Sequence, residues 1–470
     1  MNHFPFKFRK IKDKYLVTND SGSFFFCTES SLDSLLKKTL TKDFETYLKD
    51  RGFVYYQEND SYWNAFTYKL AKRKHVTEDL SYFMIIPTLR CNLKCSYCQV
   101  SRVNEDKTGF DWSNKTLEEF FEFVTLKNKS KNIKIEFQGG EPTLRVDMID
   151  KIIQWCDENY ENKEFAICTN LQKLTPELLN LIERSDVVIS TSLDGVRDLH
   201  DTQRIQDKGN TNDFFENLEF ILKTYGPSKI SALPTFTDFT KINETIDLYR
   251  RYGFEYIFLR PVNFQGFARK NFPESISQTM SWNHVYQKAL DKIFDDNYST
   301  GQHITEYSFE VSLKRIFRNN FTSHVDLRSP NFALRDYIVI DQEGHFYPSD
   351  EARMITRIKV QDLSMGNLSD GLDKDKISSF NYNQINETDP DCIHCSHQPY
   401  CGIDTVDDLS RYQRIDMPKH QTDFCESNMS KFDHIFTRLL ECKPRDFYNI
   451  SGHLTNVFSI DPFFGRYIYD

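Results

Sequence analysis

The sequence lacks any apolar run close to the roughly 18 residues that a membrane-spanning helix needs, although the chain is 470 residues long. Its opening stretch, MNHFPFKFRKIKDKYL, also lacks the uninterrupted apolar core and small-residue cleavage site of a secretory signal. From these two absences we expect a cytoplasmic protein with no membrane partner.

An excess of basic residues is absent as well. The chain has 59 lysines and arginines against 69 aspartates and glutamates, so its formal net charge is -10. This balance argues against non-specific binding to nucleic acid or to anionic membranes.

Internal repeats and low-complexity segments are also missing from the sequence. Hydrophobic residues make up 39% of the chain, which excludes an intrinsically disordered protein. The length predicts two or three folded units.

Cysteine is well represented, with 11 residues. In a reducing compartment these are not expected to form a disulfide framework, so their spacing becomes informative. Seven of them fall into two groups, which are C-x3-C-x2-C at Cys91, Cys95 and Cys98, and C-x2-C-x5-C at Cys392, Cys395 and Cys401 with Cys425 downstream.

The other four cysteines stand alone. Cys156 lies in the apolar pattern IIQWC and Cys168 lies within an expected strand, so both are predicted to be small core residues. Cys442 follows Cys425 by 17 positions and is retained as a replacement metal ligand. Cys27 is predicted only to have a structural role.

Three units are expected along the chain, at residues 1–80, 81–300 and 301–470. In the first, the apolar runs KYLVTN and SFFFCT flank an Asn-Asp-Ser-Gly turn and are followed by helical spacing, which predicts a winged-helix-like unit. In the third, YIVIDQEGHFYPS predicts a hairpin that turns at Glu343-Gly344, and a cysteine-rich stretch follows.

The middle unit alternates short apolar runs with amphipathic helical patterns, which is typical of parallel β/α repeats. Six such repeats predict an α/β fold with a partial (β/α)6 barrel, whose chemistry lies on the loops after the strands. The six expected strands are residues 82–87, 133–137, 165–170, 187–193, 230–236 and 256–262.

The first cysteine group directly follows the first expected strand, in IIPTLRCNLKCSYCQV. Three thiolates on one short loop can hold three irons of a [4Fe-4S] cube and leave the fourth iron open to a small molecule. Zinc is the alternative, but a structural zinc site needs a fourth ligand from elsewhere in the chain.

The segment CNLKCSYC resembles the signature loop of the radical S-adenosylmethionine (SAM) enzymes. The resemblance implies that the cluster on Cys91, Cys95 and Cys98 is the catalytic centre. There SAM is cleaved reductively, and the resulting 5'-deoxyadenosyl radical abstracts hydrogen from a substrate. It also implies SAM contacts at Tyr97, at the Gly-Gly-Glu-Pro segment of Gly139, Gly140, Glu141 and Pro142, and at Ser192 and Arg204. The sequence departs from the family pattern at Thr169-Asn170-Leu171, where many members of the family have Thr-Asn-Gly.

The second cysteine group is similar to the SPASM extension of peptide-modifying radical SAM enzymes. That resemblance implies one auxiliary [4Fe-4S] cluster on Cys392, Cys395, Cys401 and Cys425. A further auxiliary cluster is not expected, because Thr405 and Asp350 stand where the family pattern has cysteines. Zinc on the same four thiolates is the rival interpretation.

The whole chain is most similar to the maturases of the His-Xaa-Ser peptide-modification systems. The resemblance implies a ribosomally made precursor peptide as substrate, a reductant protein, and a companion radical SAM maturase. The first unit resembles the small winged-helix domains that bind the leader segments of such precursors, which implies that it adds the peptide as a strand to a sheet edge. Two alternatives remain open, which are sulfatase-maturase-like protein modification and a non-catalytic iron-sulfur protein for redox or electron transfer.

Overall fold

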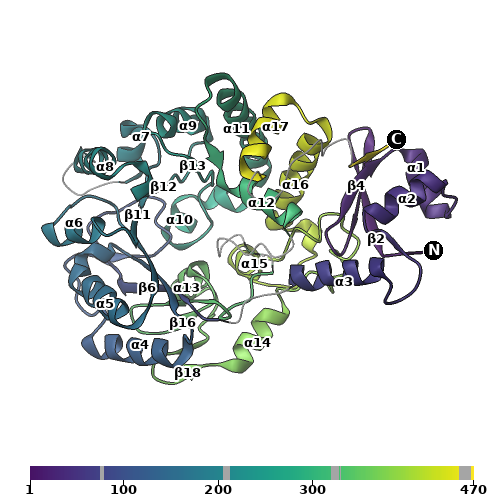
Figure 1. Cartoon of the computed structure of the whole chain (residues 1–470). Coiled ribbons are helices and arrows are strands. Elements are labelled where there is room, and N and C mark those ends of the chain that lie inside the picture. Colours follow the sequence, from purple (N-terminus) through teal and green to yellow (C-terminus); the bar gives the residue numbers. More distant parts are fainter. Residues whose placement is uncertain (75–78, 205–211, 319–327, 329, 455–466) are drawn as a thin grey trace.

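A computed structural model describes residues 1–74, 79–204, 212–318, 328, 330–454 and 467–470 (Figure 1). None of the described helices combines the length and apolar character that crossing a bilayer requires. The first unit, in purple in Figure 1, consists of β1 (Asn2–His3), β2 (Phe6–Ile11), β3 (Lys14–Asn19), β4 (Phe24–Cys27), α1 (Glu29–Lys37), α2 (Lys42–Asp50), β5 (Val54–Tyr55) and α3 (Ser61–Lys74).

The two apolar runs form the antiparallel hairpin of β3 and β4, as predicted, and β2 adds a third antiparallel strand that was not predicted. The predicted turn is present, since the Asn19 side-chain oxygen accepts hydrogen bonds from the backbone N–H groups of Ser21 and Ser23, and Gly22 adopts a φ of 79°. Helices then follow the strands. The order of elements therefore agrees with the sequence-based expectation, while the winged-helix assignment stays a prediction.

A seven-stranded sheet forms the centre of the molecule, in the order β12-β11-β10-β9-β6-β15-β16. Every neighbouring pair is parallel except β15 with β16. This confirms a mixed α/β fold with a parallel sheet. The strands are β6 (Tyr82–Thr88), β9 (Asn132–Gly139), β10 (Asn162–Cys168), β11 (Val187–Ser192), β12 (Ile230–Leu233), β15 (Tyr337–Ile340) and β16 (Phe346–Tyr347).

Six helices follow the strands of this sheet and lie along its outer side in Figure 1. The helix predicted from TLEEFFEFVTLK, with Leu117, Phe120, Phe121 and Val124 on one face, is present. Leu117, Phe120 and Val124 are buried, whereas Phe121 is only partly buried. Cys156 is fully buried in the core, also as predicted. The helices are α4 (Asn114–Lys127), α5 (Val146–Asn159), α6 (Pro176–Ile182), α7 (Arg197–Gln203), α8 (Asn212–Tyr225) and α9 (Ile242–Arg251).

The sixth expected strand is shorter than predicted. Only β13 (Tyr256–Ile257) is regular, and it pairs with β14 (Thr305–Glu306) rather than with β12. One isolated bridge, between Phe236 and Pro261, continues the parallel arrangement beyond β12. On the other side, β15 pairs with β6 and extends the sheet with a strand from beyond residue 300. The hairpin of β15 and β16 turns at Gly344, as predicted, with a φ of 84°.

The remaining elements surround the central sheet and build the cysteine-rich region, except β19, which joins the sheet of the first unit. They are β7 (Arg90–Cys91), β8 (Val103–Asn104), α10 (Gly266–Asn271), α11 (Thr279–Thr300), α12 (Tyr307–Phe317), α13 (Asp350–Arg357), β17 (Gly366–Asn367), β18 (Gly371–Leu372), α14 (Lys374–Tyr382), α15 (Thr405–Tyr412), α16 (Asp423–Glu441), α17 (Pro444–Leu454) and β19 (Ile468–Tyr469), with 3-10 turns η1 (Pro142–Arg145), η2 (Pro227–Lys229), η3 (Phe239–Lys241), η4 (Pro273–Ser277) and η6 (Lys419–Gln421).

Candidate active site

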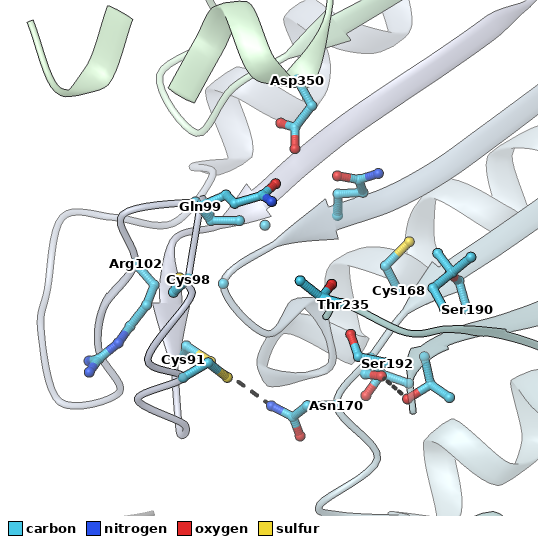
Figure 2. Close-up of a pocket in the computed structure, with 18 of the residues that line it drawn as sticks. Cys91, Cys98, Gln99, Arg102, Cys168, Asn170, Ser190, Ser192, Thr235 and Asp350 are labelled. Atoms are coloured by element: carbon cyan, nitrogen blue, oxygen red, sulfur yellow. Dashed lines mark hydrogen bonds between the residues drawn. The ribbon is translucent and has the colours of Figure 1, made fainter. Parts of the chain in front are cut away.

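A cavity of about 270 Å³ opens at the carboxyl ends of the parallel strands. Its wall combines the loop after β6 with the ends of β9, β10 and β11 and the start of α13 (Figure 2). This is where parallel β/α folds place their chemistry. Of the residues predicted from the sequence, the cavity brings together Cys91, Cys95, Tyr97, Cys98, Gly139, Gly140, Ser192 and Arg204.

The cysteine loop is fixed by backbone hydrogen bonds at several points. The N–H of Cys98 donates to the carbonyl of Cys95 at 3.2 Å, and the N–H of Phe267 donates to the carbonyl of Cys98 at 2.8 Å. At its other end, the Cys91 sulfur accepts a long hydrogen bond of 3.9 Å from the side-chain amide of Asn170, drawn as a dashed line in Figure 2. The loop therefore presents its three thiols from a defined backbone.

The chemistry of this donor set fits an iron-sulfur cube. Three cysteine side chains border one cavity, and burial raises the pKa of the Cys95 thiol to about 11, so metal binding has to displace its proton. Among the described residues, no three side chains of the histidine, cysteine, aspartate or glutamate type come close enough to share a single ion. In a cube each thiolate binds a different iron.

Gly139 and Gly140 are required by the contact between β9 and the cysteine loop. A Cβ at Gly139 would lie 2.3 Å from the carbonyl oxygen of Thr88, and one at Gly140 would lie 2.3 Å from that of Arg90. The Gly140 N–H donates to the Thr88 carbonyl at 3.0 Å. The sequence-based argument attributed both glycines to the approach of a ligand, whereas in the structure they first allow the approach of the loop that carries the cysteines.

Glu141 and Pro142 do not line the cavity, in contrast to the two glycines before them. Glu141 is 2% exposed, and its carboxylate accepts hydrogen bonds from the backbone N–H groups of Thr143 and Asn170, at 3.1 and 2.8 Å. Pro142 begins η1. Glu141 therefore joins the end of β9 to the end of β10, and it holds the Asn170 backbone whose side chain reaches Cys91.

Tyr97, Asp194 and Arg204 form a buried polar network beside the cysteines. The Tyr97 hydroxyl donates to the Asp194 carboxylate at 2.7 Å and accepts from the Arg204 guanidinium at 2.7 and 3.0 Å. The Arg204 Nε also pairs with Asp194 at 3.1 Å. Burial raises the pKa of Tyr97 well above its ordinary value, which keeps the phenol protonated and able to donate. The network orients the arginine at the cavity wall.

The opposite wall contains residues that the sequence-based reasoning missed. Cys168 was predicted to be a core residue, but it lines the cavity, and its thiol donates to the Glu136 carboxylate at 3.3 Å. The same carboxylate accepts hydrogen bonds from the Tyr82 hydroxyl and the Gln138 amide. The sequence could have indicated Glu136, because apolar and polar residues alternate in the strand IKIEF and Glu136 is at one of the polar positions.

Asp350 also reaches this cavity, from the first turn of α13 (Figure 2). It was noted in the sequence only as a residue where the SPASM pattern has a cysteine. In the structure it is 7% exposed and accepts a hydrogen bond of 2.7 Å from the Arg353 guanidinium. Because α13 follows the hairpin of β15 and β16, and β15 pairs with β6, a residue remote in sequence supplies a carboxylate to the site.

A second hollow, of about 770 Å³, is bordered by all four predicted ligands of the C-terminal group, which are Cys392, Cys395, Cys401 and Cys425. Cys442 is not among its lining residues. Cys425 lies in the first turn of α16 and Cys442 caps its far end, so 17 residues of helix separate them by roughly 25 Å. The prediction that Cys442 could replace a ligand of this group is therefore wrong.

Two histidines lie within this cysteine motif. His397 is 1% exposed, and its Nε2 is 2.8 Å from the carboxylate of Asp433, which also pairs with Arg9. This partner ties the ring to α16. His394 borders the hollow. Thr405, which replaces a family cysteine, donates its hydroxyl to the carbonyl of Asn383 at 3.1 Å.

Residues 85–277 match the model of the Radical SAM superfamily. The chain contains a radical SAM domain. This match includes the cysteine loop, the Gly139-Gly140 segment, Ser192 and Arg204, which are the parts that meet at the first cavity.

Similarity to curated relatives extends over different parts of the chain. An uncharacterized protein of Methanocaldococcus jannaschii is 29% identical over 183 residues, which is 38% of this chain and 61% of that protein. A cysteine-type anaerobic sulfatase-maturating enzyme of Clostridium perfringens is 20% identical over 374 residues, 74% of this chain and 94% of the relative. The chain thus spans less than two thirds of the first relative, whereas it spans nearly all of the sulfatase-maturating enzyme from Clostridium.

Solved structures share the fold at low identity. The sulfatase-maturating enzyme anSMEcpe with bound AdoMet has a TM-score of 0.62 and 16% identity, covering 81% of this chain and 96% of its own. Streptococcus suis SuiB bound to precursor peptide SuiA has a TM-score of 0.50 and 13% identity, covering 90% and 98%. The radical SAM domain and much of its surroundings therefore have the fold of these enzymes.

Proposed function

We propose that this protein cleaves SAM reductively at an iron-sulfur cluster held by Cys91, Cys95 and Cys98, and uses the reaction to abstract hydrogen from a ribosomally made peptide. The observation that carries the proposal is the first cavity. It joins the three cysteines to Gly139-Gly140 and to Arg204, which are remote in sequence and correspond to the SAM-binding parts of the family.

The chain's own groups have distinct tasks in this proposal. The bound cluster and SAM supply the electron transfer and the radical chemistry, as cofactors do in such enzymes. The backbone at Gly139-Gly140 receives the SAM amino group, and the Arg204 guanidinium, with its paired donors, suits the SAM carboxylate. Tyr97 would lie near the adenine of bound SAM and, with Asp194, keeps Arg204 in position. Ser192 contacts the ribose.

A peptide substrate is the finer part of the proposal. It is supported by relatives whose structures contain peptides, since SuiB was solved with the precursor peptide SuiA and anSMEcpe with the Cp18Cys peptide. We propose, from the resemblance of the sequence to the maturases of the His-Xaa-Ser systems, that the substrate is a precursor with such repeats. A protein reductant supplies the electron, and a companion maturase acts on the same precursor.

We further propose an auxiliary [4Fe-4S] cluster on Cys392, Cys395, Cys401 and Cys425. Cys401→Ser is expected to remove about four irons and four sulfides per chain, because loss of one of four thiolate ligands destabilises the cube. Cys442→Ser, at the far end of α16, is the matched control and should leave the metal content unchanged. Anaerobic elemental analysis gives the iron, sulfide and zinc content of both variants. If the unaltered protein contains stoichiometric zinc and Cys401→Ser loses that zinc instead of iron, the proposal is contradicted.

The proposed reaction is tested with a synthetic peptide that carries three His-Ala-Ser repeats. The anaerobically reconstituted protein is given SAM, dithionite and this peptide in D2O, and the peptide is sequenced by tandem mass spectrometry. A crosslink or desaturation is expected as a loss of two hydrogens within a repeat, and an epimerisation as a gain of one deuterium. The control peptide has every histidine replaced by glutamine.

Sulfatase-type maturation is the second candidate, because the Clostridium enzyme covers 74% of this chain. A cysteine peptide derived from a sulfatase is therefore included in the same assay. Modification of that peptide with no change in the His-Ala-Ser peptide would favour the second candidate. If neither peptide is altered although SAM is cleaved, the proposed His-Xaa-Ser substrate is wrong.

A further inference from the structure

The second hollow is bordered by two parts of the chain that are remote in sequence. Besides the cysteine-rich region, its wall includes Phe8, Arg9, Lys10 and Tyr15, which belong to the hairpin of β2 and β3 in the first unit. Strand β2 contacts α16, the helix whose first turn carries Cys425, and Figure 1 shows the first unit beside this helix. The first unit is therefore part of the immediate surroundings of the cysteine group.

Side chains of the first unit also hold the turn that follows Cys395. The Thr18 hydroxyl donates a hydrogen bond of 2.8 Å to the carbonyl of Ser396, and both residues are buried. The Lys7 ammonium donates a hydrogen bond of 2.7 Å to the side-chain oxygen of Gln398. Because this turn continues directly from a predicted metal ligand, its position depends on contacts with the first unit.

Arg9 connects the same hairpin to α16. Its guanidinium makes a two-pronged ion pair with the Asp433 carboxylate, at 2.7 Å from Nε to Oδ1 and at 2.6 Å from Nη2 to Oδ2. The Oδ1 atom is also 2.8 Å from Nε2 of the buried His397 ring. A two-pronged pair between a guanidinium and a carboxylate fixes the orientation of both groups. Arg9 is therefore held in place at the wall of the hollow.

The positive charge of Arg9 acts on the sulfurs of the cysteine group. Burial raises the pKa of the Cys395 thiol, and hydrogen bonding from the backbone of His397 and the charge of Arg9 oppose that rise. The Lys7 ammonium acts on Cys395 in the same sense as Arg9. Burial raises the pKa of the Cys425 thiol to about 11, again against the charge of Arg9. The guanidinium is thus placed to stabilise negative charge at these two sulfurs.

We propose that Arg9 of the first unit raises the reduction potential of the metal centre on Cys392, Cys395, Cys401 and Cys425. The inference rests on the auxiliary [4Fe-4S] cluster of the proposed function. Such a cube gains one negative charge when it takes up an electron, so a nearby cation stabilises the reduced form more than the oxidised form. Arg9 supplies charge and no iron ligand, and through it the first unit sets a property of a centre that lies outside that unit.

The test measures the reduction potential in the full-length chain with Cys91, Cys95 and Cys98 replaced by alanine, so that the radical SAM cluster cannot form. The reconstituted protein is titrated with dithionite and redox mediators in the absence of oxygen, and the reduced cluster is quantified by electron paramagnetic resonance. We expect Arg9→Gln to make reduction about tenfold less favourable, a fall of ~59 mV for a one-electron couple. The carboxylate of Asp433, which loses its partner, acts in the same direction.

Lys12→Gln is the matched control. Lys12 also forms an ion pair between the first unit and α16, with Glu441, but it is not among the residues that border the hollow. Its replacement should leave the potential unchanged. Arg9→Lys keeps the positive charge although it cannot form the two-pronged pair, so it should lower the potential less than Arg9→Gln does. Equal iron content and an unchanged spectral line shape in all variants show that the cluster is intact.

An intact cluster whose potential is unchanged in Arg9→Gln would overturn the inference, as would an equal fall in Lys12→Gln or in Arg9→Lys. If Arg9→Gln does not take up iron, Lys7→Gln decides, because the Lys7 charge also acts on Cys395. Its potential should fall as well, and an unchanged value would overturn the inference.

Failure of the auxiliary cluster has a different outcome in the same experiment. Zinc in place of iron in the starting protein would contradict the cluster, and the inference about Arg9 with it. An intact cluster with an unchanged potential in Arg9→Gln would contradict the inference alone. Because the titration involves no SAM and no peptide, its result is also independent of the proposed enzymatic reaction.

Discussion

Cys95→Ala is expected to abolish SAM cleavage and to remove about four irons per chain. The substitution takes away one of the three thiolates that border the first cavity, on a loop whose backbone is fixed at Cys98 by Phe267. Without the third ligand the cube has too few protein anchors. The rate of SAM cleavage should fall at least ~1000-fold, which corresponds to a barrier increase of roughly 4 kcal/mol.

The matched control for this variant is Cys156→Ala. Cys156 is fully buried in α5 and is not among the residues that line either hollow described above. Its replacement should lower the stability by a modest amount, about 1 kcal/mol, while the iron content stays the same. If Cys95→Ala keeps its iron and its SAM cleavage, the assignment of the loop as the cluster site fails.

Gly140→Ala should have the second-largest effect on cluster incorporation. The added Cβ would lie 2.3 Å from the Arg90 carbonyl oxygen and 2.6 Å from that of Leu89, both backbone atoms that a rotamer change cannot move. Relief of this clash has to shift the loop that begins at Cys91. We expect loss of cluster incorporation, measured as iron and as the visible absorbance of the reconstituted protein, together with a stability loss of about 3 kcal/mol.

Gly226→Ala provides the control for the glycine variant. Gly226 has a φ of 84°, so alanine is strained there, but nothing lies within 4 Å of the added Cβ. It should cost about 1 kcal/mol of stability and leave the cluster intact. Normal cluster content in Gly140→Ala, or an equal loss in both variants, would contradict the view that close backbone contact at Gly140 places the cysteine loop.

Local periodicity predicted the elements around the site well. The alternation of Ile133, Ile135 and Phe137 with polar residues predicted β9, and the cysteine loop was placed correctly after β6. Both predictions depend on residues close together in sequence, for which burial on one side of a strand dictates the spacing of apolar residues. The signature residues could therefore be assigned to the carboxyl ends of the strands of one parallel sheet.

Long-range pairing could not be predicted in the same way. The strand β15 joins β6 from more than 200 positions later, and this pairing brings α13 with Asp350 to the cavity. No local pattern encodes such a partner. Cys168 was assigned to the core because its neighbours in β10 are apolar, yet it ends the strand at the cavity wall beside Glu136.

The error at Cys442 has a different cause. Cys442 was retained as a ligand because it follows Cys425 by only 17 positions, but the intervening residues form the continuous helix α16. A helix rises 1.5 Å per residue, so it carries its two ends apart instead of returning to one metal. Cys392, Cys395 and Cys401 do border one hollow, because turns such as the one closed by the 2.9 Å hydrogen bond from the Cys395 N–H to the Cys392 carbonyl keep their segment compact.

The central claim is most directly tested by the amount of 5'-deoxyadenosine formed when the iron-loaded protein is mixed with SAM and dithionite in the absence of oxygen. We predict that the unaltered protein releases it and that a variant with Cys91, Cys95 and Cys98 all replaced by alanine releases none. An unaltered protein that carries its full iron and still forms no 5'-deoxyadenosine would contradict the account.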